Sequence, residues 1–152
     1  MDANVLLAYI DGDSDRIGVV AELFRQARAG DIELVTSVLT QTEVAYGASE
    51  GESGRLDAEV EAKIDELWKP ASPLKMVELS PAVAQEARAI IRAEFADGRS
   101  GLKPPDAIHL ATAKRMAVAA FYTYDKPLQR HRPSVSFPIT EPIIQQAQFP
   151  GT

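Results

Sequence analysis

The sequence predicts an α/β domain of three layers, α/β/α, in which a short central parallel sheet carries helices on both faces. Short apolar segments of strand character alternate with longer segments whose apolar residues recur at helical spacing. Such alternation is typical of parallel βαβ connections. With 152 residues, the chain is long enough for one domain with a substantial core and too short for two ordinary ones. We therefore expect a single domain over residues 1–152, with a core at about 2–140 and a C-terminal tail at 141–152.

The first predicted elements are two helices separated by a turn. Asp2 and Asn4 precede or cap a short helix that runs to Ile10. Residues 11–15 form an acidic turn, and Gly30 follows the second helix, at the position where glycine commonly ends a helix. The apolar residues of this second helix fall on one face: Ile17, Val20, Leu23, Phe24 and Ala27.

A short strand and two helical segments are predicted next. Residues 32–36 form the strand, and residues 37–46 form a helix with Ser37 as its cap and Glu43 in its interior. The glycine- and serine-rich residues 47–54 are typical of a surface connection. Helical spacing returns at residues 56–68.

The second half of the chain continues the alternation. Ser80-Pro81 predicts the start of a helix, because proline is well tolerated in a first helical turn. A polar loop at 97–101 separates this helix from another that begins near Pro105. The buried residues expected in the first of these helices are Val83, Ala87, Ile90, Ile91 and Phe95. The strand candidates of this half are residues 76–79, 119–123 and 135–139.

Four acidic residues are expected at one edge of the sheet. Ligands of parallel sheets bind beyond the carboxyl ends of the strands. Glu43 and Asp125 each follow a predicted strand, and Asp106 lies in the first turn of its helix, where the helix dipole favours a carboxylate. Asp2 lies at the chain start, where a strand could precede a helix. We therefore expect these acids to meet.

Carboxylates are the main groups that this sequence offers for chemistry. The chain has no cysteine and only two histidines, so thiolate nucleophiles and cysteine-type zinc sites are excluded. A cluster of carboxylate oxygens suits Mg²⁺, with Mn²⁺ as a substitute. Such ions activate water and stabilise charge on a leaving oxygen. Metal-assisted hydrolysis of a phosphodiester fits this set better than glycoside or acyl chemistry.

Net charge and hydropathy limit how this protein could interact with nucleic acids and membranes. The net charge of −6 argues against a protein that coats nucleic acid through bulk electrostatics, but a metal site can reverse the local sign. No apolar run approaches the roughly 20 residues that span a bilayer, and no leader pattern is evident at the N-terminus. We expect a cytoplasmic protein with no membrane partner.

Four sequence blocks, taken in order, resemble those of PIN-domain ribonucleases, and in particular VapC-like toxins of bacterial type II toxin–antitoxin pairs. The Pro-Asp-Ala-Ile-His-Leu-Ala-Thr-Ala block is the most specific of them, and the resemblance extends from Asp2 to about Ile139. The blocks are residues 2–7, Ser37 with Glu43, residues 105–113 and residues 123–125.

The resemblance implies a site, an activity and partners. Asp2, Glu43 and Asp106 would be catalytic acids that bind Mg²⁺, and Asp125 would complete the site directly or through water. The residues implied to position these acids or waters are Asn4, Ser37 and Thr123. The implied activity is endonucleolytic cleavage of RNA. A homodimer and an antitoxin protein that inserts near the active site are implied as well.

Several readings stay open at this point. Family members usually have an apolar strand before the first acid, so we expect one to precede Asp2, since unpaired neighbouring strands would lose hydrogen bonds. The chain could instead be a catalytically weak PIN-fold binding module, or a DNA nuclease or phosphatase with the same acids. His109 could face the site, although packing is its more common role. Residues 129–132 form a basic turn that could contact RNA phosphates or be plain surface.

Overall fold

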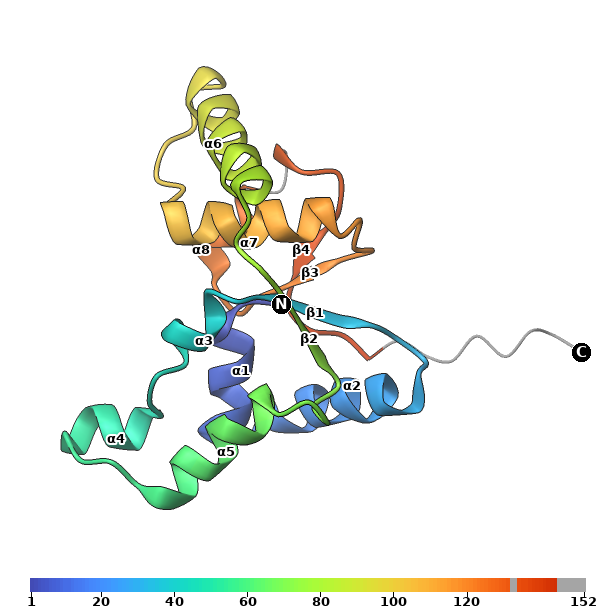
Figure 1. Cartoon of the computed structure of the whole chain (residues 1–152). Helices are drawn as coiled ribbons and strands as arrows, with labels where there is room; N and C mark the ends of the chain where they lie inside the picture. Colours follow the sequence, from blue (N-terminus) through green and yellow to red (C-terminus); the bar gives the residue numbers. More distant parts are fainter. Residues whose placement is uncertain (132–133, 145–152) are drawn as a thin grey trace, which may run out of the picture.

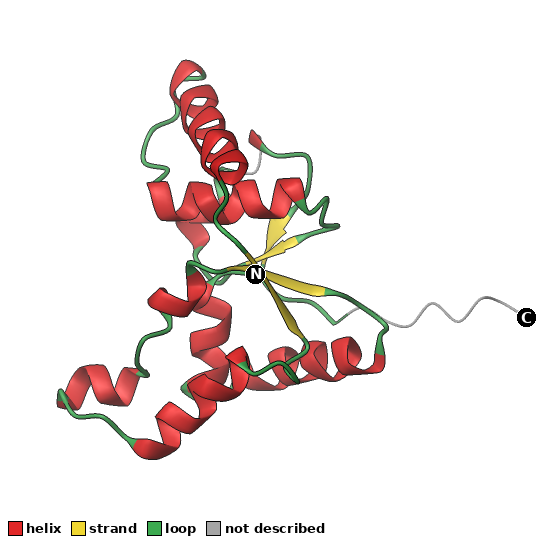
Figure 2. Ribbon diagram, viewed as in Figure 1, coloured by secondary structure: helices red, strands yellow, loops and turns green. Residues whose placement is uncertain are grey.

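A computed structural model describes residues 1–131 and 134–144, and within them helices and short strands alternate along the chain (Figures 1 and 2). The helices are α1 (Ala3–Ile10), α2 (Ile17–Ala29), α3 (Thr40–Glu43), α4 (Ala48–Ser53), α5 (Ala58–Trp68), α6 (Pro81–Ala96), α7 (Pro104–Arg115) and α8 (Lys126–Gln129). The strands are β1 (Leu34–Ser37), β2 (Leu74–Val77), β3 (Phe121–Tyr122) and β4 (Ile139–Thr140).

The strands form two small parallel sheets. β1 pairs with β2, with Leu34 opposite Leu74, and β3 pairs with β4. The first residues of the chain connect the two sheets: the Met1 ammonium donates to the Val35 carbonyl at 2.8 Å, and the Asp2 amide donates to the Tyr122 carbonyl at 3.3 Å. The predicted parallel α/β class is confirmed, but the central sheet is divided where β1 and β3 face each other across this short segment.

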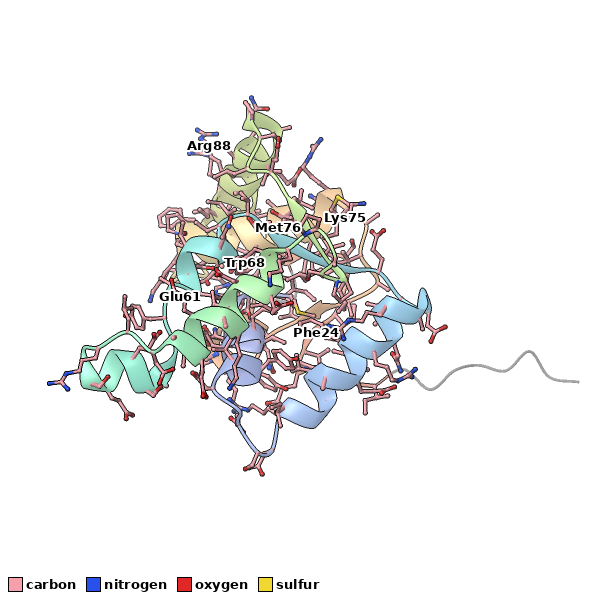
Figure 3. All side chains as sticks on the ribbon, turned by 60° about the horizontal axis from the view of Figure 1, so that its bottom comes forward. Phe24, Glu61, Trp68, Lys75, Met76 and Arg88 are labelled. Carbon is pink, nitrogen blue, oxygen red and sulfur yellow. The ribbon has the colours of Figure 1, made fainter. Side chains whose placement is uncertain are left out.

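Helices cover the strands on both sides, which gives the layered arrangement seen in Figure 1. One apolar cluster joins α1, α2 and α5 to β1 and β2. Figure 3 shows Phe24 of α2 and Trp68 of α5, which both contact this cluster. A second cluster joins α6 and α7 to β3, α8 and β4. Among the described residues, no helix is both long and apolar enough to cross a membrane.

The helices whose ends carry local signals begin and end close to the predicted positions. The Ser80 hydroxyl caps α6 and Pro81 lies in its first turn. Gly30 ends α2 in the left-handed conformation with φ of 80°, which glycine adopts at little cost. The predicted buried residues Val83, Ala87 and Ile90 are buried.

Two predictions in the region after β1 are wrong. The predicted helix over 37–46 is only the single turn α3, and Glu43 is its last residue instead of an interior one. The predicted connection over 47–54 contains α4. The buried carboxylate of Glu50 explains this helix, because it accepts hydrogen bonds from the amides of Gly47 at 3.0 Å and Asp57 at 2.6 Å.

The C-terminal end of α6 also differs from the prediction. Phe95 was expected in the buried stripe but is 77% exposed. The preceding residue, Glu94, is buried, and its carboxylate contacts Arg99, His131 and Ser134. A buried carboxylate is tolerated when its lone pairs are satisfied by such donors. The polar contacts of Glu94 therefore decide which face of α6 turns inward.

Candidate active site

The four predicted acids lie at the ends of four different elements. Asp2 precedes α1, Glu43 ends α3, Asp106 lies in the first turn of α7, and Asp125 precedes α8. In Figure 1 these ends lie on the same side of the strands, to the left, where the carboxyl ends of β1 and β3 lead into α3 and α8. The structure thus places the acids at the edge where parallel sheets bind their ligands.

Asp2 is buried, with 4% of its surface exposed. Its carboxylate accepts a hydrogen bond from the Val5 amide at 3.4 Å, as an N-cap, and another from the Thr123 hydroxyl. Burial raises the pKa of Asp2, while the Thr123 hydrogen bond and the nearby Met1 ammonium act in the opposite direction. A carboxylate that is costly to bury as an anion is a natural place for a cation.

Thr123 connects two of the acids. Its fully buried hydroxyl donates to the Asp2 carboxylate and accepts a hydrogen bond from the Asp125 amide at 2.9 Å. Because one hydroxyl oxygen contacts both segments, it fixes the start of α1 relative to the turn after β3. The structure therefore gives Thr123 a geometry suited to positioning the acids.

Asp106 is half-buried among like charges. Its pKa is raised first by burial and then by the negative charge of Asp125, with a smaller contribution from Glu43. His109 and Lys103 act in the opposite direction. Negative charge from two other elements, carried by Asp125 and Glu43, therefore lies near this residue, and a cation would relieve the repulsion.

Glu43 is held by a histidine that local sequence reasoning treated mainly as a packing residue. The Nε2 atom of His109 lies 2.7 Å from a carboxylate oxygen of Glu43, and His109 is 3% exposed. His109 stands three residues after Asp106, so both side chains project from one face of α7. The three-residue spacing between Asp106 and His109 is a signal that the sequence contains, but it does not identify Glu43 as the partner of the histidine.

The family model of the PIN domain matches residues 1–132 of this chain. The chain belongs to the PIN domain family. PIN domains are generally nucleases and typically depend on a divalent metal. No match to this chain was found among curated proteins or among solved structures.

Two further predicted site residues of this PIN domain are Asn4 and Ser37. Asn4 is exposed on α1 and lines a cavity of about 440 Å³ together with Asp125 and Tyr124. The Arg16 guanidinium stacks on the Tyr124 ring in the same cavity, 4.3 Å from its centroid. Ser37 is buried, and its hydroxyl accepts from the Leu39 amide at 3.2 Å. Ser37 thus shapes the turn into α3.

The acids of this PIN domain fit a hard divalent cation by their chemistry. All four are carboxylates, and the raised pKa of Asp2 and of Asp106 reports that their negative charge is poorly solvated or repelled. Within residues 1–131 and 134–144, no three acidic or imidazole side chains converge tightly enough to surround one ion. The expected meeting of the four acids is therefore not seen as a tight cluster: they lie on one side of the strands, at the ends of four separate elements.

The raised pKa of Asp106 predicts a pH-dependent cost to stability. Because the folded carboxyl binds its proton more tightly than the unfolded one, Asp106 lowers the stability of the folded state as the pH rises above the ordinary value of 3.8. In EDTA, Asp106→Asn should gain stability over wild type as the pH rises from that value toward neutrality. Urea unfolding at a series of pH values measures this difference, and a difference that does not change with pH would contradict it.

Proposed function

We propose that this PIN domain is a Mg²⁺-dependent endoribonuclease that hydrolyses RNA phosphodiester bonds. The observation that carries the proposal is that Asp2, Glu43, Asp106 and Asp125 stand at element ends on one side of the strands, with the pKa of Asp106 raised by burial and by the charge of Asp125. The choice of RNA rests on the resemblance of the sequence blocks to PIN-domain ribonucleases.

Asp2, Glu43, Asp106 and Asp125 are the residues that would hold the cation. A divalent ion bound there supplies a more acidic water and offsets the charge that develops on the leaving oxygen. The neighbouring residues act on the acids themselves: the Thr123 hydroxyl orients Asp2, and His109 holds the Glu43 carboxylate at 2.7 Å. Hydrolysis by water in this way leaves a 5′-phosphate and a 3′-hydroxyl.

Incubation of the purified protein with single-stranded and structured RNAs tests the proposal. We expect cleavage with Mg²⁺ or Mn²⁺, no cleavage in EDTA, and little or no cleavage of DNA of matched sequence. Products should accept labelling that requires a 5′-phosphate and a free 3′-hydroxyl. Tight RNA binding without turnover at saturating Mg²⁺ would instead favour a binding module. Preferred cleavage of DNA would overturn the assignment of RNA as the substrate.

We further propose that the ribonuclease is the toxin of a type II pair, acts as a homodimer and is inhibited by a cognate antitoxin. The resemblance to VapC-like toxins supports this role.

A further inference from the structure

A second cleft is lined by residues that lie close in the chain to Asp106 and Asp125. It has a volume of about 420 Å³ and lies between the segment that precedes α7 and the segment around α8. The residues that line it are Arg99, Ser100, Gly101, Pro127, Arg130 and His131. In Figure 1 the loop from α6 descends to the start of α7 just above α8, and both segments carry residues that line the cleft.

Residues that line the cleft are close in sequence to Asp125 and Asp106. Asp125 caps one end of α8 and Arg130 caps the other. At 1.5 Å of rise per residue, a one-turn helix separates these two residues by about 7 Å along its axis. That spacing is comparable to the reach of one nucleotide unit. On the other wall, Gly101 lies shortly before α7, whose first turn carries Asp106.

The cleft offers positive charge in a chain whose net charge is −6. Arg130 is exposed, and in the part of the chain that the structure describes its guanidinium makes no hydrogen bond or ion pair. Arg99 is partly engaged, because its Nε lies 3.2 Å from Glu94 and its Nη2 lies 2.8 Å from Asp97. Of the two arginines that line the cleft, Arg130 is therefore the one whose charge is free for a ligand, and Arg99 supplies a second, partly neutralised charge.

A buried carboxylate fixes two of the side chains that line the cleft. Glu94 is 1% exposed and contacts Arg99 on one side, while its other oxygen lies 2.6 Å from Nδ1 of His131. These contacts hold two lining side chains that come from segments far apart in the sequence. Arg99 and His131 are therefore pre-positioned as supporting donors, since a fixed group loses less entropy on binding an anion than a free surface side chain does.

We propose that this cleft binds the RNA backbone phosphate next to the one that is cleaved, with Arg130 as its main ligand and Arg99 and His131 as supporting donors. The inference rests on the proposed function and deepens it. The site acids repel the RNA backbone, so a strand that lies across them needs cations beside the acids. Arginine suits this task, because its guanidinium donates two parallel hydrogen bonds to phosphate oxygens.

Binding of a labelled single-stranded RNA of 12 nucleotides, followed by fluorescence anisotropy, tests the proposal. The parent protein for this measurement is the Asp106→Asn variant with Mg²⁺, so that no cleavage interferes. Each of Arg130→Gln, Arg130→Lys and Arg88→Gln is then introduced separately into this parent. Arg88 is an exposed α6 residue outside the cleft (Figure 3). We expect Arg130→Gln to weaken binding about 10-fold and to flatten the slope of log affinity against log salt by about 0.7, the loss of one phosphate contact. Arg130→Lys should keep the slope, and Arg88→Gln should change neither quantity.

The possible results separate the two proposals. Equal affinity and slope for Arg130→Gln and its parent would overturn the phosphate site, even if wild type cleaves RNA. Binding that depends on Arg130 in a protein that never cleaves RNA would support the phosphate site and reject the nuclease. An Arg88→Gln effect as large as that of Arg130→Gln would assign the binding to diffuse charge, and no RNA binding at all would overturn the site.

Discussion

Asp106→Asn should reduce metal-dependent RNA cleavage by at least about 10³-fold, equivalent to about 4 kcal/mol of transition-state stabilisation. Asparagine keeps the size of the side chain and removes the charge that a cation requires. Asp106 lies where charge from Asp125 and Glu43 accumulates, so its loss weakens the whole site. Mg²⁺ should raise the melting temperature of wild type and have a much smaller effect on the variant, because binding to the folded state alone stabilises it.

Glu61→Gln is the matched control for this prediction. It neutralises a carboxylate that is exposed on α5, far from the site acids in sequence and visible in Figure 3. Cleavage and the Mg²⁺-induced shift should both stay at wild-type levels in this control. Full cleavage by Asp106→Asn, with the fold verified by circular dichroism, would remove Asp106 from the catalytic set.

Thr123→Val should lower cleavage by about 10- to 100-fold, the usual cost of losing a group that orients a metal ligand. Valine nearly matches the shape of threonine but has no hydroxyl. The Asp2 carboxylate loses a donor and the Asp125 amide loses an acceptor at 2.9 Å, both at a fully buried position. We also expect a loss of about 1–3 kcal/mol in the free energy of unfolding, because buried polar groups are left unsatisfied.

Two variants make this prediction specific. Thr123→Ser keeps the hydroxyl and should recover most of the activity. Thr112→Val removes another buried hydroxyl, one that donates only to the Ile108 carbonyl of its own helix at 2.8 Å, and should leave cleavage close to wild type. If Thr112→Val and Thr123→Val lose activity equally, the hydroxyl of Thr123 has no special role in placing the acids.

The sequence by itself was sufficient to predict the elements whose signals are local. Helix α6 begins at Ser80-Pro81 because a capping hydroxyl and a first-turn proline act within a few residues. Gly30 ends α2 for an equally local reason. The PIN family could also be predicted, because the motif blocks occur in order, and so could the location of the four acids at element ends. Their role in binding a cation stays a prediction.

Only the tertiary structure decided the features that depend on partners distant in the chain. Glu43 pairs with a histidine 66 residues later, and Glu94 with one 37 residues later. Helix α4 differs in that the partners of Glu50 are near, since its buried carboxylate binds the amides of Gly47 and Asp57, three and seven residues away. Hydrophobic periodicity treats each of these glutamates as a solvated residue, because it compares neighbours only within a few helical turns. The burial of Glu94 and the partial burial of Glu43 are favourable once the fold supplies donors for the charge, and the histidine donors come from segments whose proximity no local pattern specifies.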